Sequence, residues 1–342
     1  MPDALNPRTA VDLAFWPIVA ILAVALPLAY DDSYVMAELI LFGIYFAINL
    51  MWSLVLGTAG LYSFATLAFV GAGAYLCAWL SINHGLPWWA FAPCGIAIGA
   101  VGGLLVALPA VRLKGVYFAL LTIGLVEACN QYVTSSENLG GAQGLVGADP
   151  IIPPSKQGLI EGYYYAYIAI AVIVAIALLV YWWVSSGKLG LRLRTARESE
   201  PVAQALGINI PRARLAVFVI TAGVLGLVGA FRAGYDAGAN KSVFSFSQLL
   251  LLFAMIVVGG INSPKGILLG TALLLYIEQH FISWDAPRLI LLGAIMLLIT
   301  LFTTDGLAGI PDQIGRALRS RRGAPPSADD AAAAATMGGG EP

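Results

Sequence analysis

The chain has 342 residues, of which 59% are hydrophobic and only 11% are charged, and its formal net charge is −1. A soluble domain has about 45–50% apolar and about 25% charged residues, so this composition excludes a soluble globular protein. It predicts an all-α, polytopic bundle of transmembrane helices, and the 38 glycines suit helices whose backbones pack closely.

Ten segments are candidates for a spanning helix, which needs roughly 20 mostly apolar residues. The third begins with GLYSFATLAFVGAGAY, which predicts an irregular start packed inside protein. The sixth, YYAYIAIAVIVAIALLVYWWV, has aromatic residues at both ends, as membrane interfaces favour, and the eighth is short. The ten segments are 11–30, 35–56, 61–81, 88–110, 116–134, 164–184, 214–233, 247–260, 266–282 and 288–304.

The basic residues predict the orientation of these spans. With both termini in the cytoplasm, nearly every basic residue falls in a cytoplasmic loop or in the tail, as the positive-inside rule requires. We therefore assign residues 1–310 to one transmembrane domain, with its main cytoplasmic loop at 185–213, and residues 311–342 to a cytoplasmic tail. After Arg322 the tail reads GAPPSADDAAAAATMGGGEP, a low-complexity sequence that is expected to be disordered.

The charged loop RLRTARESEPVAQALGINIPRAR contains the signals of a short helix. Thr195 and Glu198 match a capping box, in which each side chain satisfies a free amide at the helix start. Ser199 is an alternative cap, because serine often precedes the first helical turn. Gly207 is placed where a left-handed residue would end the helix.

Between these ends the sequence EPVAQAL is apolar or small, apart from Glu200 in the first turn and one glutamine. Val202 and Leu206 are four residues apart and share one helix face, with Ala203 alongside. A helix of this length is only marginally stable in water. We therefore expect it to dock into a groove on a partner protein.

The segment ARESEPVAQALGINIPRARLAVFVITAGVLGLVGAF resembles the cytoplasmic loop and following helix of ABC importer permeases of the branched-chain amino-acid type, the LivM-like group. In that family the short helix corresponds to the coupling helix, which inserts into the ATPase subunit. Glu200, Ala203, Ala205 and Gly207 match its pattern, whereas Pro201 replaces the usual alanine. The resemblance runs from about 35 to 310, through the further blocks GLYSFATLAFVGAGAYL, VRLKGVYFALLTIGLVEACNQYV, NLGGAQGLVG and VVGGINSPKGILLGTALL.

The resemblance implies a permease subunit in the inner membrane that is not itself an enzyme. The sequence has no Walker A motif, so the chain is expected to bind no cofactor, with ATP and Mg²⁺ held by a partner ATPase. The implied partners are a homologous second permease subunit, cytoplasmic ABC ATPase subunits, an extracytoplasmic substrate-binding protein and membrane lipid, and no nucleic acid. The implied coupling residues are Thr195, Glu198, Glu200, Val202, Ala203, Leu206 and Gly207.

The cargo is left open by the sequence. Branched-chain amino acids are the default for the family, and urea, short amides or other amino acids are alternatives that similar permeases carry. An ion-coupled secondary transporter is a further alternative, which would need carboxylates near the membrane midplane at broken helices. Glu127 is the one candidate for that role.

Four polar residues form a stripe on the fifth predicted span: Glu127, Asn130, Gln131 and Thr134 recur at i, i+3, i+4 and i+7. One interpretation is that the stripe lines a translocation pathway, since ionisable residues inside membranes usually serve function. The other is that it forms hydrogen bonds between helices of the bundle. The sequence does not distinguish them.

Small residues form two further stripes. They predict close contacts between helices, where a missing side chain lets two backbones meet. One stripe consists of Gly95, Gly99 and Gly103 on the fourth span, and the other of Ala222, Gly226 and Ala230 on the seventh.

The remaining polar and sulfur-containing residues suggest no catalytic site. Cys77, Cys94 and Cys129 lie in apolar segments without metal-ligand spacing and are expected to be free thiols. We expect no metal site. The sequence GGAQG in the predicted outer loop 135–163 is either part of a surface that faces the binding protein or an ordinary glycine turn.

Overall fold

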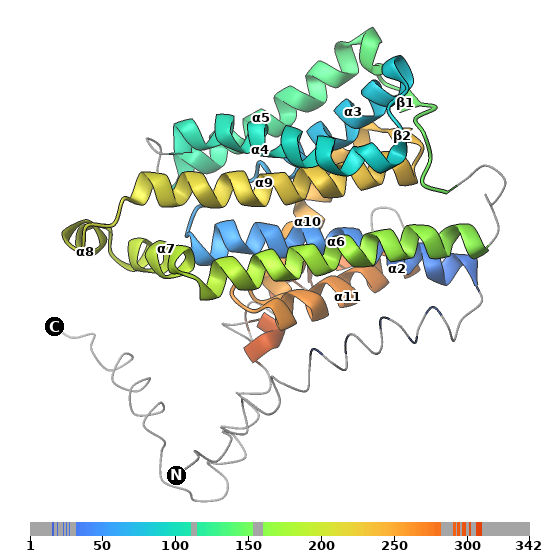
Figure 1. Ribbon diagram of the computed structural model, residues 1–342. Helices are drawn as coiled ribbons and strands as arrows, with labels where there is room; N and C mark the ends of the chain where they lie inside the picture. Colours follow the sequence, from blue (N-terminus) through green and yellow to red (C-terminus); the bar gives the residue numbers. More distant parts are fainter. Residues whose placement is uncertain are drawn as a thin grey trace, which may run out of the picture. The chain divides into compact units, whose positions relative to one another are not determined.

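The computed structural model describes residues 32–110, 115–152, 160–281 and 306–309, together with single positions between 16 and 27 and between 290 and 301. In these residues the chain is helical apart from loops and one short two-stranded ladder, so the predicted all-α membrane fold is confirmed. The chain forms two compact units, Met1–Phe253 and Ala254–Pro342. Figure 1 shows the helices of the first unit running along one common direction.

The first unit holds most of the long helices. Their bounds are α2 Ser33–Ser53, α3 Thr66–His84, α4 Phe91–Ala110, α5 Val116–Ser135, α6 Ile160–Ser186, α7 Lys188–Glu198, α8 Glu200–Ala205 and α9 Ile210–Tyr235. Short elements connect them: η1 Leu54–Thr58, η2 Trp88–Ala90, η3 Glu137–Leu139, β1 Leu145–Val146, β2 Gly238–Ala239 and η5 Lys241–Phe244. Helix α10, Phe246–Gly259, leads into the second unit, where α11, Pro264–His280, and η7, Gly306–Gly309, follow.

Among the described residues, 6 helices are long and apolar enough to cross a membrane. They are Ser33–Thr58, Thr66–His84, Trp88–Pro109, Val116–Ser135, Ile160–Ser186 and Ile210–Tyr235, which correspond to the second to seventh predicted spans. The count of ten is not confirmed, because α10 has 14 residues and α11 has 17. Most of the first and tenth predicted spans, and the whole tail 311–342, lie outside the described residues.

Helix α9 packs against both α4 and α3, and the two predicted stripes of small residues meet at its contact with α4. A Cβ atom placed on Gly95 would lie 2.5 Å from the Cβ of Ala230, and one on Gly103 would lie 2.5 Å from the Cβ of Ala222. A Cβ on Gly99 would lie 3.0 Å from the Cα of Gly226. The predicted close contacts are therefore confirmed, and the two stripes are each other's partner.

The third span begins irregularly, as predicted. Helix α3 starts at Thr66, and the preceding non-helical residues are held by side chains from other helices. The indole nitrogen of Trp52 donates to the carbonyl of Ser63 at 2.6 Å, and the amide of Phe64 donates to the hydroxyl of Thr122 at 2.9 Å. Because lipid offers no hydrogen bonds, non-helical backbone at membrane depth needs such partners inside protein.

Described residues of the first predicted span adjoin α6. Their positions are helical, and two of their carbonyls accept hydrogen bonds from tyrosines of α6. The Tyr164 hydroxyl donates to the carbonyl of Pro27, and the Tyr167 hydroxyl donates to the carbonyl of Ala23, each at 2.6 Å.

In the second unit, glycines bring α10 and α11 together. A Cβ on Gly270 would lie 2.7 Å from the Cα of Gly259. Helix α11 starts at Pro264, and the hydroxyl of Ser263 caps it by accepting from the amide of Gly266 at 3.3 Å. These contacts give a structural role to the block VVGGINSPKGILLGTALL, whose glycines and serine lie at the contact and the helix start.

We predict that Gly226→Ala destabilises the protein, because the new Cβ would lie 2.8 Å from the Cα of Gly99 and would push α4 away from α9. The expected loss is about 1–3 kcal/mol in the free energy of unfolding. Thermal unfolding of the detergent-purified protein measures it. The control is Gly124→Ala on α5, where no atom lies within 4 Å of the new Cβ. Equal melting temperatures for both variants would contradict this account of the packing.

We also predict that Thr122→Val destabilises the start of α3. Valine keeps the shape of the fully buried threonine and removes the acceptor of the Phe64 amide. An unsatisfied buried amide costs about 1–3 kcal/mol. Hydrogen exchange of the residue 60–66 amides should therefore accelerate, whereas exchange in α9 should stay unchanged.

Candidate functional site

The predicted coupling segment contains two helices, α7 and α8, where the sequence suggested one. Thr195 lies inside α7 and donates its hydroxyl to the carbonyl of Leu191 at 3.0 Å, and Glu198 is the last residue of that helix. The capping-box prediction is therefore wrong. The run KLGLRLRTARE favours a continuous helix from Lys188, and inside a helix a threonine bonds back to the preceding turn. The alternative start is correct in position, since Ser199 is extended (φ −155°) and α8 begins at Glu200.

Gly207 ends helix α8, as the sequence predicted. Gly207 has a φ of 73°, in the left-handed region that glycine adopts without strain. Its amide donates to the carbonyl of Gln204 at 2.9 Å, and the amide of Ile208 donates to the carbonyl of Ala203 at 3.0 Å. These two bonds are the Schellman pattern, so the role predicted for Gly207 in ending the helix is confirmed.

The apolar residues of α8 divide between two faces, contrary to the single face that the sequence suggested. Ala203 is fully buried and packs with Ala196, Ile208 and Ile210. Val202 is 52% exposed and Leu206 is 68% exposed. The difference arises because the chain around α8 supplies its own cover for Ala203. Only the outer face is left for another protein.

An ion pair holds α8 against α9. The Nη2 atom of Arg214 lies 2.6 Å from the Oε1 atom of Glu200, and the two side chains are only 11% and 26% exposed. This pair was not predicted from the sequence, where Arg214 counts only as one of the basic residues of the charged loop. The sequence feature that could have predicted the pair is a basic residue, Arg214, at the end of the loop and an acidic residue, Glu200, in the first turn of the short helix.

A second arginine holds α7 against the end of α2. The guanidinium of Arg197 donates to the carbonyl of Gly57 in η1, the π-helical continuation of α2. The aliphatic part of the same side chain covers Gly60, where a Cβ would lie 2.7 Å from its Cγ. A cation at a helix C-terminus is favourable because the exposed carbonyls there carry partial negative charge. Helices α7 and α8 are thus fixed to two different membrane helices.

Replacing Glu200 by glutamine should loosen α8, because the Arg214 guanidinium would lose its charged partner. Charge-assisted hydrogen bonds in enclosed sites contribute about 1–3 kcal/mol, so amide exchange over residues 200–207 should rise roughly 5- to 100-fold. Hydrogen exchange with mass spectrometry measures this. The matched control, Glu198→Gln at an exposed position, should leave the exchange of α8 unchanged; equal effects would contradict the clamp.

The polar stripe of α5 points away from the core of the first unit. Glu127 and Gln131 are exposed, and Asn130 and Thr134 are half-buried. The Thr134 hydroxyl donates to the carbonyl of Asn130 at 2.8 Å, and the Gln131 amide donates to the hydroxyl of Ser135 at 3.4 Å. All hydrogen bonds of this stripe to described residues stay within α5, so these residues do not join α5 to another described helix.

The outer loop after α5 is built on its glycines. Gly140, Gly141 and Gly144 all have positive φ, and β1 pairs with β2 in an antiparallel ladder, Leu145 opposite Ala239. Asp149 ties the loop to η2, which precedes α4 in the chain, by accepting from the amide of Trp88 at 2.9 Å. The GGAQG sequence therefore shapes a loop that is attached to the end of α9.

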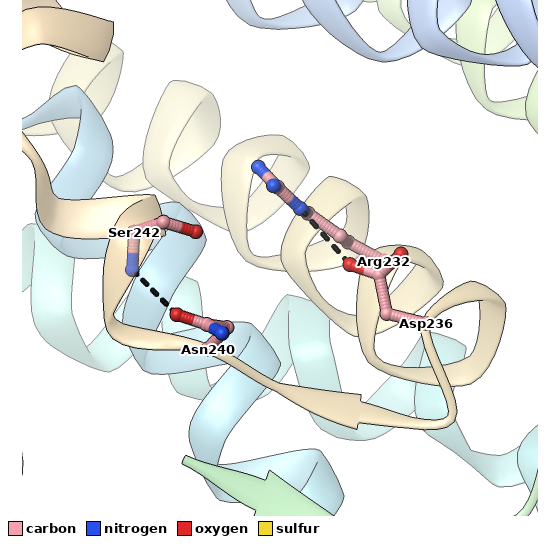
Figure 2. A network of polar contacts seen from close by, with 4 residues as sticks. All are labelled: Arg232, Asp236, Asn240 and Ser242. Carbon is pink, nitrogen blue, oxygen red and sulfur yellow. Dashed lines mark hydrogen bonds and ion pairs between the residues drawn. The ribbon is translucent and has the colours of Figure 1, made fainter. Parts of the chain in front are cut away.

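A polar cluster at that end of α9 was missed by the sequence analysis (Figure 2). The Nε atom of Arg232 lies 3.2 Å from the Oδ2 atom of Asp236, one helical turn later. Burial raises the pKa of the Asp236 carboxyl, although the Arg232 guanidinium acts in the opposite direction. The side chain of Asn240 then accepts from the amide of Ser242 at 3.0 Å and turns the chain into η5. Arg232 lies inside an apolar span, where ionisable residues are rare, and this feature could have predicted the cluster from the sequence.

The three cysteines are free thiols, as predicted. Over the ranges that the structure describes, no three His, Cys, Asp or Glu residues are grouped so that they could hold a metal ion.

The family description "Branched-chain amino acid transport system / permease component" matches residues 34–300. The chain belongs to this family. It is 26% identical over 330 residues to the high-affinity branched-chain amino acid transport system permease protein LivM of Escherichia coli (strain K12), covering 89% of this chain and 76% of the relative. It is 25% identical, with the same coverage, to LivM of Salmonella typhimurium.

A probable LivM permease of Methanocaldococcus jannaschii is 26% identical over 235 residues, covering 63% of this chain and 66% of the relative. No solved structure matches the chain. Membership of this permease family, together with the 6 apolar helices, identifies a multi-pass inner-membrane transport component. The family is one of transport permeases and not of enzymes.

Proposed function

We propose that the chain is a membrane-spanning subunit of an ATP-binding-cassette importer and that it translocates branched-chain amino acids delivered by an external binding protein. The observation that carries the proposal is α8, a short helix held by Arg214 and the Schellman turn, with Val202 and Leu206 exposed. Figure 1 shows α8 at the end of the first unit opposite to the β1–β2 ladder. By the positive-inside rule this end is cytoplasmic.

Helix α8 has the properties of a docking element that transmits movement. Two exposed apolar side chains on a rigid helix fit a hydrophobic groove, in the way that amphipathic helices bind partner proteins. The ion pair to Arg214 and the bond from Arg197 to Gly57 connect the segment to α9 and α2. A displacement of α8 by an ATPase subunit would therefore move membrane helices. ATP and Mg²⁺ belong to that partner in this proposal, and this chain binds no cofactor.

The exposed face of α5 is an argument for a second permease subunit. An ionised carboxylate facing lipid is costly, by about 2.5–3.5 kcal/mol or more at the centre of a membrane helix. Glu127 is exposed in the first unit, so in the membrane this face requires cover from a protein or from a water-filled pathway. We assign it to the contact and pathway that this chain forms with a homologous permease. The printed names of the relatives support branched-chain amino acids as cargo.

The test is uptake of labelled L-leucine by the complex with its ATPase and binding protein in proteoliposomes. Leu206→Asp should reduce ATP-driven uptake at least about tenfold, because a buried unpaired charge at the docking surface costs several kcal/mol. The matched control is Leu191→Asp, an equally exposed leucine on α7, which should stay within about twofold. Both variants should insert and fold normally.

Two results would overturn the proposal. One is undiminished uptake by the Leu206→Asp complex. The other is uptake that stops when ion gradients are collapsed at constant ATP, which would indicate an ion-coupled transporter.

A further inference from the structure

The Arg232 guanidinium is only partly satisfied by the protein. Arginine has five N–H donors. One, on Nε, points to Asp236 at 3.2 Å, and one, on Nη1, reaches the side-chain oxygen of Gln248 at 3.1 Å when that amide is oriented so that its nitrogen donates to the carbonyl of Ser242 at 2.9 Å. The other three have no acceptor among the described residues.

The side chain is nevertheless largely enclosed, at 17% exposure. A guanidinium in such a position is favourable only when its donors meet acceptors, because water is mostly excluded. Figure 2 shows that the terminal nitrogens point away from the Asp236 carboxylate, so Asp236 occupies only the Nε side. Of the four N–H donors on the terminal nitrogens, one reaches Gln248 and three have no acceptor among the described residues. The fork of a guanidinium matches a carboxylate, which it binds through two parallel hydrogen bonds.

The start of α10 lies beside Arg232. Gln248 is in the first turn of α10, and its backbone amide donates to the Ser245 hydroxyl at 3.3 Å. Helix N-termini carry partial positive charge and favour anions. Arg232 thus lies next to a second positive feature. The single carboxylate bonded to it, Asp236, is 46% exposed and is directed to one edge of the guanidinium.

We propose that Arg232, with Gln248 and the start of α10, forms a binding site for the α-carboxylate of the transported amino acid at the extracytoplasmic end of α9. This inference rests on the proposed function for the choice of ligand. Helix α9 ends beside the β1–β2 ladder, at the end of the first unit opposite α8, which is where a delivered substrate enters (Figure 1). The ligand completes the hydrogen bonding of Arg232, because its carboxylate supplies acceptors that the described residues lack.

Asp236 acts as the internal competitor in this site. Its carboxylate holds one edge of the guanidinium while the site is empty. It makes one contact, through Nε at 3.2 Å, and not the two parallel hydrogen bonds of a carboxylate in the fork, so its hold on Arg232 is weaker than that of a carboxylate with full access to the fork. Substrate and Asp236 therefore share Arg232, and removing the Asp236 charge should strengthen binding of the substrate.

This competition separates a binding role from a merely structural ion pair. In the full complex in proteoliposomes, Arg232→Gln should reduce L-leucine uptake at least about tenfold, and Arg232→Lys should retain an intermediate rate. Asp236→Asn should leave uptake unchanged or increase it. A structural pair predicts instead that Arg232→Gln and Asp236→Asn fall together. Lys241→Gln, a neighbouring cation in η5, is the control and should stay within about twofold.

A direct measurement does not depend on transport. Arg232 in the purified complex, without binding protein, is modified with phenylglyoxal and quantified by mass spectrometry. L-Leucine and isovalerate, which both carry a carboxylate, should slow the modification several-fold, whereas isoamylamine, which lacks one, should not. Arg212, exposed at the other end of α9, serves as the internal control and should react equally in all samples.

Protection by isoamylamine equal to that by isovalerate, absence of protection by any of the three, or parallel loss in the Arg232 and Asp236 variants would overturn the carboxylate site. Failure of the wild-type complex to take up L-leucine with ATP would instead overturn the proposed function, while the protection experiment would still decide whether Arg232 binds a carboxylate.

Discussion

The close approach of the α9 backbone to α3 and α4 is the constraint on which the first unit depends. Membrane helices gain little from the hydrophobic effect when they associate, because lipid tails are as apolar as their side chains. Contact must come from dense packing, and small residues allow it. Gly226 meets Gly99 on α4. It also lies close to Gly73 on α3, since a Cβ placed on Gly73 would lie 2.9 Å from the Cα of Gly226. Because Gly226 has no side chain, α9 contacts both neighbours closely at this position.

The proposed docking helix and the proposed carboxylate site attach to the two ends of this helix. At one end Arg214 holds α8, and at the other Arg232 lies beside Asp236 and the start of α10. Helix α9 has 26 residues and so measures about 39 Å. Because its middle is packed tightly, a shift at one end would be transmitted along the helix and would not be absorbed by soft packing. The glycines that stabilise the bundle thus lie between the proposed docking element and the proposed carboxylate site.

The membrane also explains where irregular backbone is found. The chain leaves α2 through a π-helical turn and crosses residues 59–65 without regular structure before α3 begins. Trp52 and Thr122 supply the hydrogen bonds that water would supply in a soluble protein. Arg197 bonds to the same region from α7. The segment is therefore a junction between α2, α3 and α7.

Composition and local order were enough to predict a helical membrane protein, the approximate positions of six spans, the irregular start of α3 and the left-handed stop at Gly207. These follow from hydropathy, from the shortage of charge and from glycine's access to positive φ, all of which act over a few residues. The family was also recognisable from short blocks in order. Local patterns nevertheless misled at Thr195, where a capping box matched in sequence inside a continuous helix.

Only the tertiary structure decided which surfaces meet. It paired the glycine stripe of α4 with that of α9, covered Ala203 while leaving Val202 and Leu206 exposed, and turned the stripe at Glu127 away from the core of its own unit. It also brought Glu200 to Arg214 and Gln248 to Arg232, residues that are separated along the chain. The physical reason is that hydropathy and capping describe a helix alone, whereas partners across helices depend on the rotation and approach of two helices, which only packing fixes.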